Sequence, residues 1–149
     1  MIVSSMIVVA DTSGLLAAFD AGEREHTRAR GVLSRETLVI SPLVLTELDH
    51  LVHREFGFRA AIAAIESLTN RVADGQYALA EVSNDDLETA ARVRTEYADL
   101  ELDLSDGVGV AIAEKYRTNR IFTLDHRDFR AIRPLSPEFS SFLLLPSDA

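Results

Sequence analysis

Residues 6–13 read Met6-Ile7-Val8-Val9-Ala10-Asp11-Thr12-Ser13, and this stretch decides the fold. Its first five residues form an apolar, largely β-branched run, which is typical of a buried parallel strand. The run ends on Asp11, and an apolar periodic segment begins at Gly14. Asp11 is therefore predicted to lie at the carboxyl end of a strand, where open α/β sheets bind their ligands.

The rest of the chain alternates between strand-like and helix-like segments. Short apolar runs predict four further strands, at residues 38–40, 77–80, 120–124 and 140–145. Helical periodicity and caps such as Ser41-Pro42 and Ser83 predict helices at 14–20, 23–33, 42–56, 58–72, 84–97 and 106–116. Strands that alternate with helices predict a three-layer α/β/α sandwich around a mostly parallel central sheet.

The composition is that of one globular domain. The chain has 149 residues, 47% hydrophobic and 26% charged, and we interpret 1–149 as a single domain with a non-essential extension at 1–5. No apolar run approaches the roughly 20 residues that span a membrane, and no signal-peptide pattern is present. The chain has no cysteine, which excludes disulfides and thiolate metal sites, so we expect a cytoplasmic protein without membrane contact.

The net charge of −9 restricts the function classes. A protein that binds nucleic-acid phosphates by its own charge should be basic, so this class is disfavoured. A metal-dependent nuclease remains compatible, because bound cations invert the local field.

Four acids share one position relative to the predicted elements. Asp11, Glu47, Asp106 and Asp125 each follow a strand directly or lie in the first turns of a helix. Taken singly, each has an ordinary explanation as a helix cap, an exposed helix residue, a first-turn acid or a turn residue. Taken together they predict a cluster, because the carboxyl ends of parallel strands meet at one edge of a sheet.

Such a cluster has a characteristic chemistry. Neighbouring carboxylates repel one another, and a divalent cation removes the repulsion. Oxygen ligands without cysteine favour Mg²⁺ or Mn²⁺ over Zn²⁺, and one or two such metals typically support phosphodiester hydrolysis. Asp103 is a weaker candidate than Asp106, because the helix is predicted to begin at Asp106.

The motifs together resemble the PIN-domain family, and most of all the ribonuclease toxins of VapBC toxin–antitoxin modules. The similar motifs, in matching order and spacing, are residues 8–13, 46–47, 104–106 and 121–125 with Phe129. The resemblance implies a PIN-like fold and an Mg²⁺- or Mn²⁺-dependent endoribonuclease toxin. It also implies an RNA substrate, a small antitoxin protein as inhibitor, and a homodimer.

By this resemblance, Asp11 and Asp106 would bind the metal directly, and Glu47 and Asp125 would complete the catalytic quartet. Hydroxyl side chains would aim the carboxylates or hold a metal-bound water; these are Thr12, Ser13 and Thr123.

Two glycines depart from the pattern of these toxins. Such toxins commonly have an alanine-rich helix after the third acid, whereas this chain has Gly107 and Gly109.

An antitoxin would offer Arg or Lys to the carboxylates and an apolar helix to a neighbouring groove. We expect the helices at 42–56 and 58–72 to supply that groove, with contacts from Leu43, Leu51 and Ile62.

Three alternatives are distinguishable. A receiver-like signalling domain needs a lysine at a strand end, and the only lysine, Lys115, falls inside a predicted helix. A dehalogenase-like phosphatase needs an aspartate two residues after Asp11, where this chain has Ser13. A non-catalytic PIN binding module would be expected to lack some of the acids, and all four are present.

Overall fold

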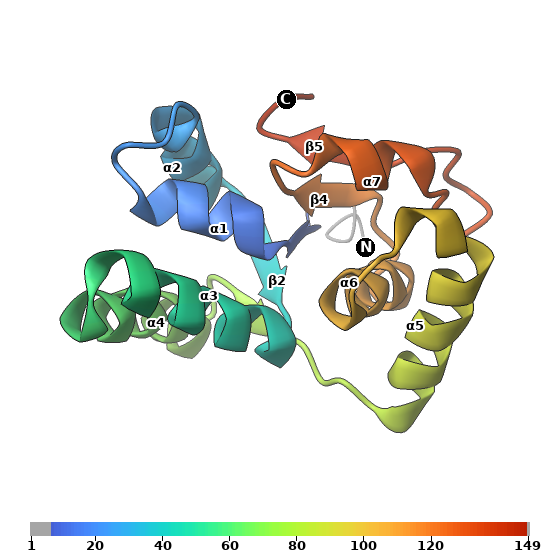
Figure 1. The fold of residues 1–149 in the computed structure, drawn as a ribbon, viewed down its shortest axis with the longest axis horizontal. Helices are drawn as coiled ribbons and strands as arrows, with labels where there is room; N and C mark the ends of the chain where they lie inside the picture. The colour runs from blue at the N-terminus through green and yellow to red at the C-terminus, as the bar shows by residue number, and fades with distance from the viewer. Residues whose placement is uncertain (1–6, 149) are drawn as a thin grey trace.

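The computed structural model describes residues 7–148 and contains a five-stranded sheet whose pairs are all parallel, in the order β3-β2-β1-β4-β5 (Figure 1). The strands are β1 (Ile7–Ala10), β2 (Thr37–Ile40), β3 (Ala78–Leu79), β4 (Arg120–Phe122) and β5 (Leu143–Leu145). The predicted α/β/α sandwich with a parallel sheet is confirmed.

Helices connect successive strands. They are α1 (Thr12–Phe19), α2 (His26–Arg35), α3 (Pro42–Phe56), α4 (Phe58–Ala73), α5 (Asn84–Glu96), α6 (Leu104–Lys115) and α7 (His126–Ala131), with a short 3₁₀ helix, η2, at Ala98–Leu100. None of the helices within residues 7–148 is long and apolar enough to cross a membrane.

Four strands of the sheet, β1, β2, β4 and β5, contribute to two cores. Val8 and Ala10 of β1 pack with α1 to α4, whereas Val9 packs with α5, α6 and α7 on the other face. The alternation follows from the two-residue period of a strand. Figure 1 shows the two helix layers on opposite sides of the sheet. Both faces are buried, which explains why β1 is apolar at every position.

The start of α1 is fixed against β4. The backbone N–H of Asp11 donates to the carbonyl of Phe122 at 2.9 Å. A Cβ at Gly14 would lie 2.6 Å from that same carbonyl oxygen, so only glycine allows α1 to approach so closely. This contact brings the residues after β1 and β4 together.

The predicted caps of α3 and α5 are present. Ser41 accepts a hydrogen bond from the N–H of Leu43, with Pro42 at the first helical position. Ser83 and Asp86 exchange both bonds of a capping box, at 2.9 and 3.2 Å. These two helix starts were therefore encoded locally.

Some predicted boundaries were wrong. Helix α6 begins at Leu104 rather than Asp106, because the Asp103 carboxylate caps it by accepting the N–H of Asp106 at 2.8 Å. Helix α7 was not predicted, and α2 begins at His26 rather than residue 23. The expectations for Met6 and for an extension at 1–5 concern residues outside the described range.

Candidate metal centre

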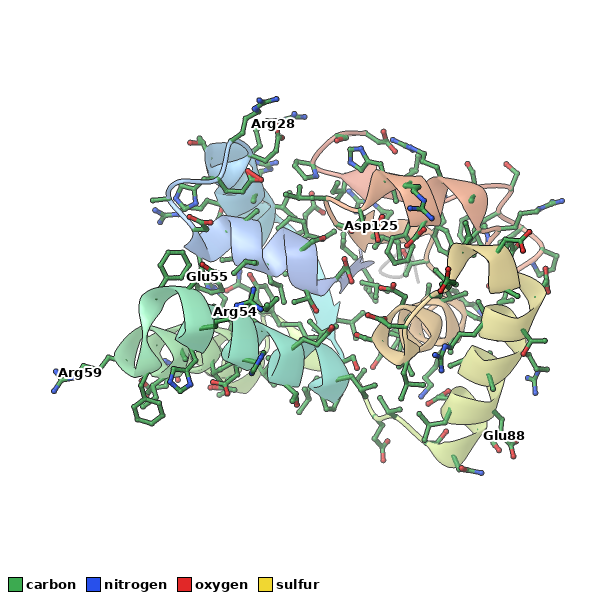
Figure 2. All side chains as sticks on the ribbon, in the orientation of Figure 1. Arg28, Arg54, Glu55, Arg59, Glu88 and Asp125 are labelled. Atoms are coloured by element: carbon green, nitrogen blue, oxygen red, sulfur yellow. The ribbon has the colours of Figure 1, made fainter. Side chains whose placement is uncertain are left out.

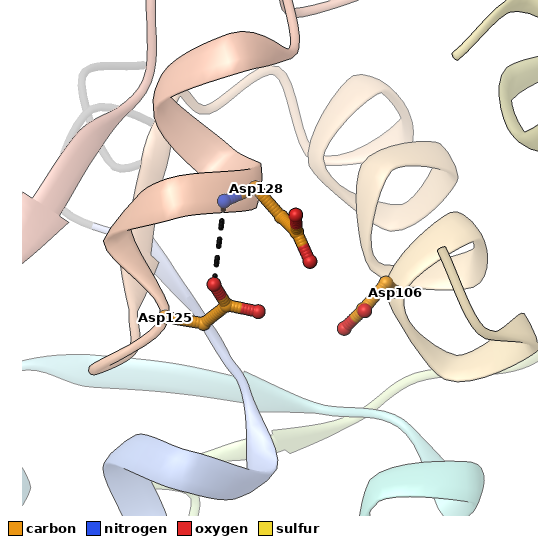
Figure 3. Close-up of side chains that lie close together, drawn as sticks. All are labelled: Asp106, Asp125 and Asp128. Carbon is orange, nitrogen blue, oxygen red and sulfur yellow. Dashed lines mark hydrogen bonds between the residues drawn. The ribbon is translucent and has the colours of Figure 1, made fainter. Parts of the chain in front are cut away.

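Three aspartates converge from the starts of two helices. Asp106 belongs to α6, Asp125 precedes α7, and Asp128 belongs to α7. Each offers a carboxylate oxygen, and the three oxygens lie within 4.8 Å of one another (Figure 3). In Figure 2, Asp125 lies between the two helix layers, whereas Arg59 and Glu88 extend from the outer sides of the molecule. We call these three residues the aspartate triad.

The local sequence explains how the triad is oriented. Asp103-x-x-Asp106 and Asp125-x-x-Asp128 have the same spacing, and in each the first carboxylate accepts the N–H of the second residue. The distances are 2.8 Å at α6 and 3.3 Å at α7. An aspartate is favoured at both positions of a helix start, because free N–H groups and the helix dipole stabilise negative charge there. Two acidic helix starts that face each other therefore bring the carboxylates together.

Two side-chain hydroxyls hold the Asp11 carboxylate. Ser13 Oγ and Thr123 Oγ1 both donate to Asp11 Oδ2, at 2.9 and 2.8 Å. The same hydroxyls accept the N–H groups of Leu124 and Asp125, each at 2.9 Å. The Asp11 side chain makes no capping bond to α1. Its orientation is therefore set by Ser13 of α1 and by Thr123 in the loop after β4.

Glu47 reaches the site from α3. Its Oε1 accepts a hydrogen bond from Thr12 Oγ1 at 2.8 Å. Glu47 also lines an open groove of about 350 Å³ between α3 and the start of α6. The other residues that line this groove are Leu43, Thr46, Asp103, Leu104 and Ser105.

Burial and neighbouring negative charges raise the pKa of several carboxyl groups in the site. Burial, followed by the negative charges of Asp11 and Asp103, raises the pKa of Asp106 to about 8. Burial also raises the pKa of Asp11, although the hydroxyls that bond it partly oppose this effect. Burial and the charge of Asp125 raise the pKa of Asp128. Within residues 7–148, Asp11, Asp106 and Asp125 form no ion pair with a basic side chain.

The predicted acids occupy this edge of the sheet but differ in proximity. Asp106 and Asp125 belong to the triad, and the charge of Asp11 acts on Asp106. Glu47 bonds Thr12, the residue that follows Asp11. The three predicted hydroxyl residues, Thr12, Ser13 and Thr123, each bond one of the predicted acids. The roles of all seven residues in catalysis or metal binding stay predictions.

Sequence reasoning missed Asp128. The available signal was the repeated Asp-x-x-Asp spacing, which marks Asp128 as the partner of a second acidic helix start. Asp103 was considered and ranked below Asp106; it lies outside the triad and acts as the cap of α6.

Lys115 does not approach the acids of the site. Its Nζ lies 2.6 Å from Asp86 Oδ2 and donates to the Glu81 carbonyl at 2.9 Å. The lysine therefore joins the end of α6 to the start of α5. A receiver-like domain, which needs a lysine beside its acidic site, is disfavoured.

Comparisons with known proteins place this geometry in context. Residues 8–134 match the family model described as PIN domain. The chain is 40% identical over 130 residues to Ribonuclease VapC26 of Mycobacterium tuberculosis, which covers 86% of this chain and 93% of that protein.

Two solved structures share the fold. One is M. tuberculosis VapC20, described as a Sarcin-Ricin loop cleaving toxin, with a TM-score of 0.71 and 24% identity over 80% of this chain and 91% of that chain. The other is a toxin–antitoxin complex from Klebsiella pneumoniae, with a TM-score of 0.57 and 23% identity over 84% of this chain and 92% of that chain. At these identities the likeness concerns the fold alone.

Proposed function

Because the chain belongs to the PIN domain family, we propose that it is an Mg²⁺- or Mn²⁺-dependent endoribonuclease and the toxin of a VapBC-type toxin–antitoxin module. The observation that carries the proposal is the aspartate triad, with Asp11 near enough for its charge to raise the pKa of Asp106. A relative that is 40% identical over most of both chains is named a ribonuclease. The protein acts in the cytoplasm in this proposal.

The residues present fit a hard divalent cation. The triad offers only carboxylate oxygens, which Mg²⁺ and Mn²⁺ prefer. The raised pKa of Asp106 indicates that this carboxylate lacks compensating positive charge, whereas Asp128 has Arg127 at 3.8 Å. When bound, the cation would neutralise these carboxylates, lower the pKa of an attacking water and stabilise charge on the leaving oxygen.

The acids divide the work by position. Asp106, Asp125 and Asp128 would hold the cation from the starts of α6 and α7. Asp11 lies outside the triad, but its charge acts on Asp106, and it would supply a further direct ligand. Glu47 lines the groove beside the triad, where it would orient a water or help to hold a second cation.

The hydroxyl side chains keep the carboxylates in place. Thr12 bonds Glu47, while Ser13 and Thr123 bond the same oxygen of Asp11. Fixed carboxylates bind a cation without first losing conformational freedom, which is how groups behind metal ligands support affinity. These three residues are positioning residues in this proposal.

Cleavage of RNA with and without metal tests the function. We expect the purified protein to cut structured RNA in millimolar Mn²⁺ or Mg²⁺, and excess EDTA to abolish the cuts. Re-addition of Mn²⁺ should restore them. Cleavage that persists in EDTA contradicts the metal-dependent mechanism, and an inert protein in saturating Mn²⁺ contradicts the nuclease.

A groove between α3 and α4 supports the proposed antitoxin. It measures about 380 Å³ and combines apolar walls with an acidic rim; the lining residues are Leu45, Thr46, Asp49, Ile62, Ile65 and Glu66. Phe58, at the start of α4, is 63% exposed. This chemistry suits an amphipathic helix with basic residues along one side. Of the three expected contacts, Ile62 lines this groove, and Leu43 lines the one beside Glu47.

Co-expression with the neighbouring small gene tests the partner. We expect a stable complex with suppressed cleavage, built on a toxin homodimer. Ile62→Asp should weaken the complex while the free toxin keeps its cleavage rate. The toxin assignment fails if the protein is monomeric, binds no neighbouring product and is harmless when expressed alone.

A further inference from the structure

A small cavity lies directly behind the acidic site. It is bounded by β1, β4, α3, α6 and α7, and its polar lining residues are Asp11, Ser41 and Ser105. The remaining walls are apolar and include Val9, Ile121 and Phe129. The cavity gives the centre of a water molecule about 10 Å³ in which to move, so it holds one water and little more.

Ser105, which lines both this cavity and the groove beside Glu47, carries a polar group without a partner. The residue is 8% exposed, and its Oγ has no hydrogen-bond partner among the described residues. Of the buried side-chain nitrogen and oxygen atoms in the described range, only this one lacks a partner. A buried hydroxyl without a partner is costly, and native structures normally satisfy it with protein or with ordered water.

Gly109 borders the same cavity. A Cβ added at Gly109 would meet no atom within 4 Å, so no neighbouring group requires a glycine there. Ser105 and Gly109 are four residues apart on α6, and both line the cavity. Glycine is among the poorest helix formers, so its presence at a helix position without steric need calls for another reason. Gly107 differs, because its Cβ would lie 3.1 Å from the Ala90 side chain.

We propose that one buried water occupies this cavity and joins Ser105 Oγ to the Asp11 carboxylate, so that Ser105 is a positioning residue for the metal site. The inference deepens the proposed function and rests on it for the role of Asp11. Ser41 supplies a third polar wall, which gives the water the two to four partners that buried waters have. The hydrogen bond from this water would reach the Asp11 carboxylate from the α6 side. Ser13 and Thr123 bond the same carboxylate from α1 and from the loop after β4.

Gly109→Ala separates this role from a merely structural one. Because Gly109 lines the cavity and a Cβ there meets no atom within 4 Å, we expect the added methyl group to take up part of the space of the water. The helix gains a better helix former at the same time. We expect an unchanged or higher melting temperature together with Mn²⁺ affinity that is about tenfold weaker. Ser105→Ala should weaken Mn²⁺ binding to a similar extent, since it removes one partner of the water.

Thr118→Val is the matched control. Thr118 has a buried hydroxyl just before β4, at the end of the strands away from the acids. This hydroxyl donates to the Ile7 carbonyl at 2.6 Å. Its removal should lower the melting temperature and leave the Mn²⁺ dissociation constant within about twofold, because it does not touch the acids.

The decisive measurements are Mn²⁺ calorimetry on the four proteins and a high-resolution crystal structure of the wild type. An ordered water within hydrogen-bonding distance of Ser105 Oγ and the Asp11 carboxylate supports the inference. A dry cavity overturns it, and so does a Gly109→Ala protein that binds Mn²⁺ as the wild type does. A wild type that binds no Mn²⁺ contradicts the proposed function instead, and the crystallographic water then decides the inference alone.

Discussion

Aspartates in two regions of this molecule are held in opposite ways. Arg130 donates two hydrogen bonds of 2.7 Å to Asp148, and this contact lowers the pKa of Asp148 to about 2. Asp106 lies among other acids, and its pKa is raised to about 8. Asp148 therefore has its counter-charge within the chain, whereas the site around Asp106 needs one from outside.

The same contrast separates the acidic starts of two neighbouring helices, α5 and α6. At the start of α5, burial opposes ionisation of Asp86, but hydrogen bonds from Lys115 and Ser83 outweigh it and lower the pKa. At the start of α6 no basic side chain compensates Asp106 within the described residues. A folded chain tolerates such uncompensated charge at some cost in stability, and that cost is typical of functional sites.

The largest expected effect comes from removing an uncompensated acid. Asp106→Asn or Asp11→Asn should reduce RNA cleavage by more than about 100-fold, because each removes a carboxylate that would bind the metal directly. Initial rates in saturating Mn²⁺ measure the loss. Asp86→Asn is the control, since it removes a compensated acid: it should lower the melting temperature and keep the cleavage rate. Equal losses in all three variants would contradict the division between the two regions.

The next effect is on stability, and it tests the missing counter-charge directly. Mn²⁺ at 100 times its dissociation constant should stabilise the fold by about 2.7 kcal/mol, if it binds only the folded state. For a chain of this size, that is a rise in melting temperature of about 5–10 °C. Asp106→Asn should raise the metal-free melting temperature and abolish the response to Mn²⁺. A wild type that melts at the same temperature with and without Mn²⁺ would show that the acids need no external charge.

Most of the fold was predictable because its signals are local. The apolar run of β1 ends on an aspartate, and Ser41-Pro42 and the Ser83 capping box mark the starts of α3 and α5. The start of α6 was misplaced because Asp103 and Asp106 are both acceptable caps by residue type. Only the bond from the Asp106 N–H to Asp103 distinguishes them.

The position of the site was predictable from the sequence, but not all of its residues were. Asp11 was found because it directly follows β1, and Asp125 because it directly follows the predicted strand at 120–124, although β4 itself ends at Phe122. Asp128 was missed because α7 has six residues, too few for helical periodicity to be recognised. Its proximity to Asp106 depends on how α6 and α7 pack, and no local pattern encodes that packing.

The pH dependence of stability should differ in sign between the two regions. The native state holds a proton on Asp106 up to about pH 8, whereas the unfolded state releases it near pH 3.8. Metal-free stability should therefore fall as the pH rises from about 4 to 8. Asp148 has a lowered pKa, so its contribution is present above pH 3.8 and is lost as the pH falls towards 2. Urea unfolding at several pH values measures both, and Asp106→Asn should flatten only the upper range. An unchanged upper range in that variant would assign the effect to other groups.

The smallest expected effect is at Lys115, which compensates Asp86 at the surface between α5 and α6. The lysine is 39% exposed, so its ion pair is partly screened by solvent. Lys115→Met keeps the aliphatic packing and removes the charge, and it should cost about 1 kcal/mol, or about 2–4 °C in melting temperature. Asp86 still accepts the N–H of Ser83, so the helix start survives. Cleavage and Mn²⁺ affinity should not change, because Lys115 contributes no charge to the aspartate triad. A Lys115→Met protein with altered Mn²⁺ affinity would mean that α6 transmits the loss to Asp106, and the two regions would then be coupled rather than independent.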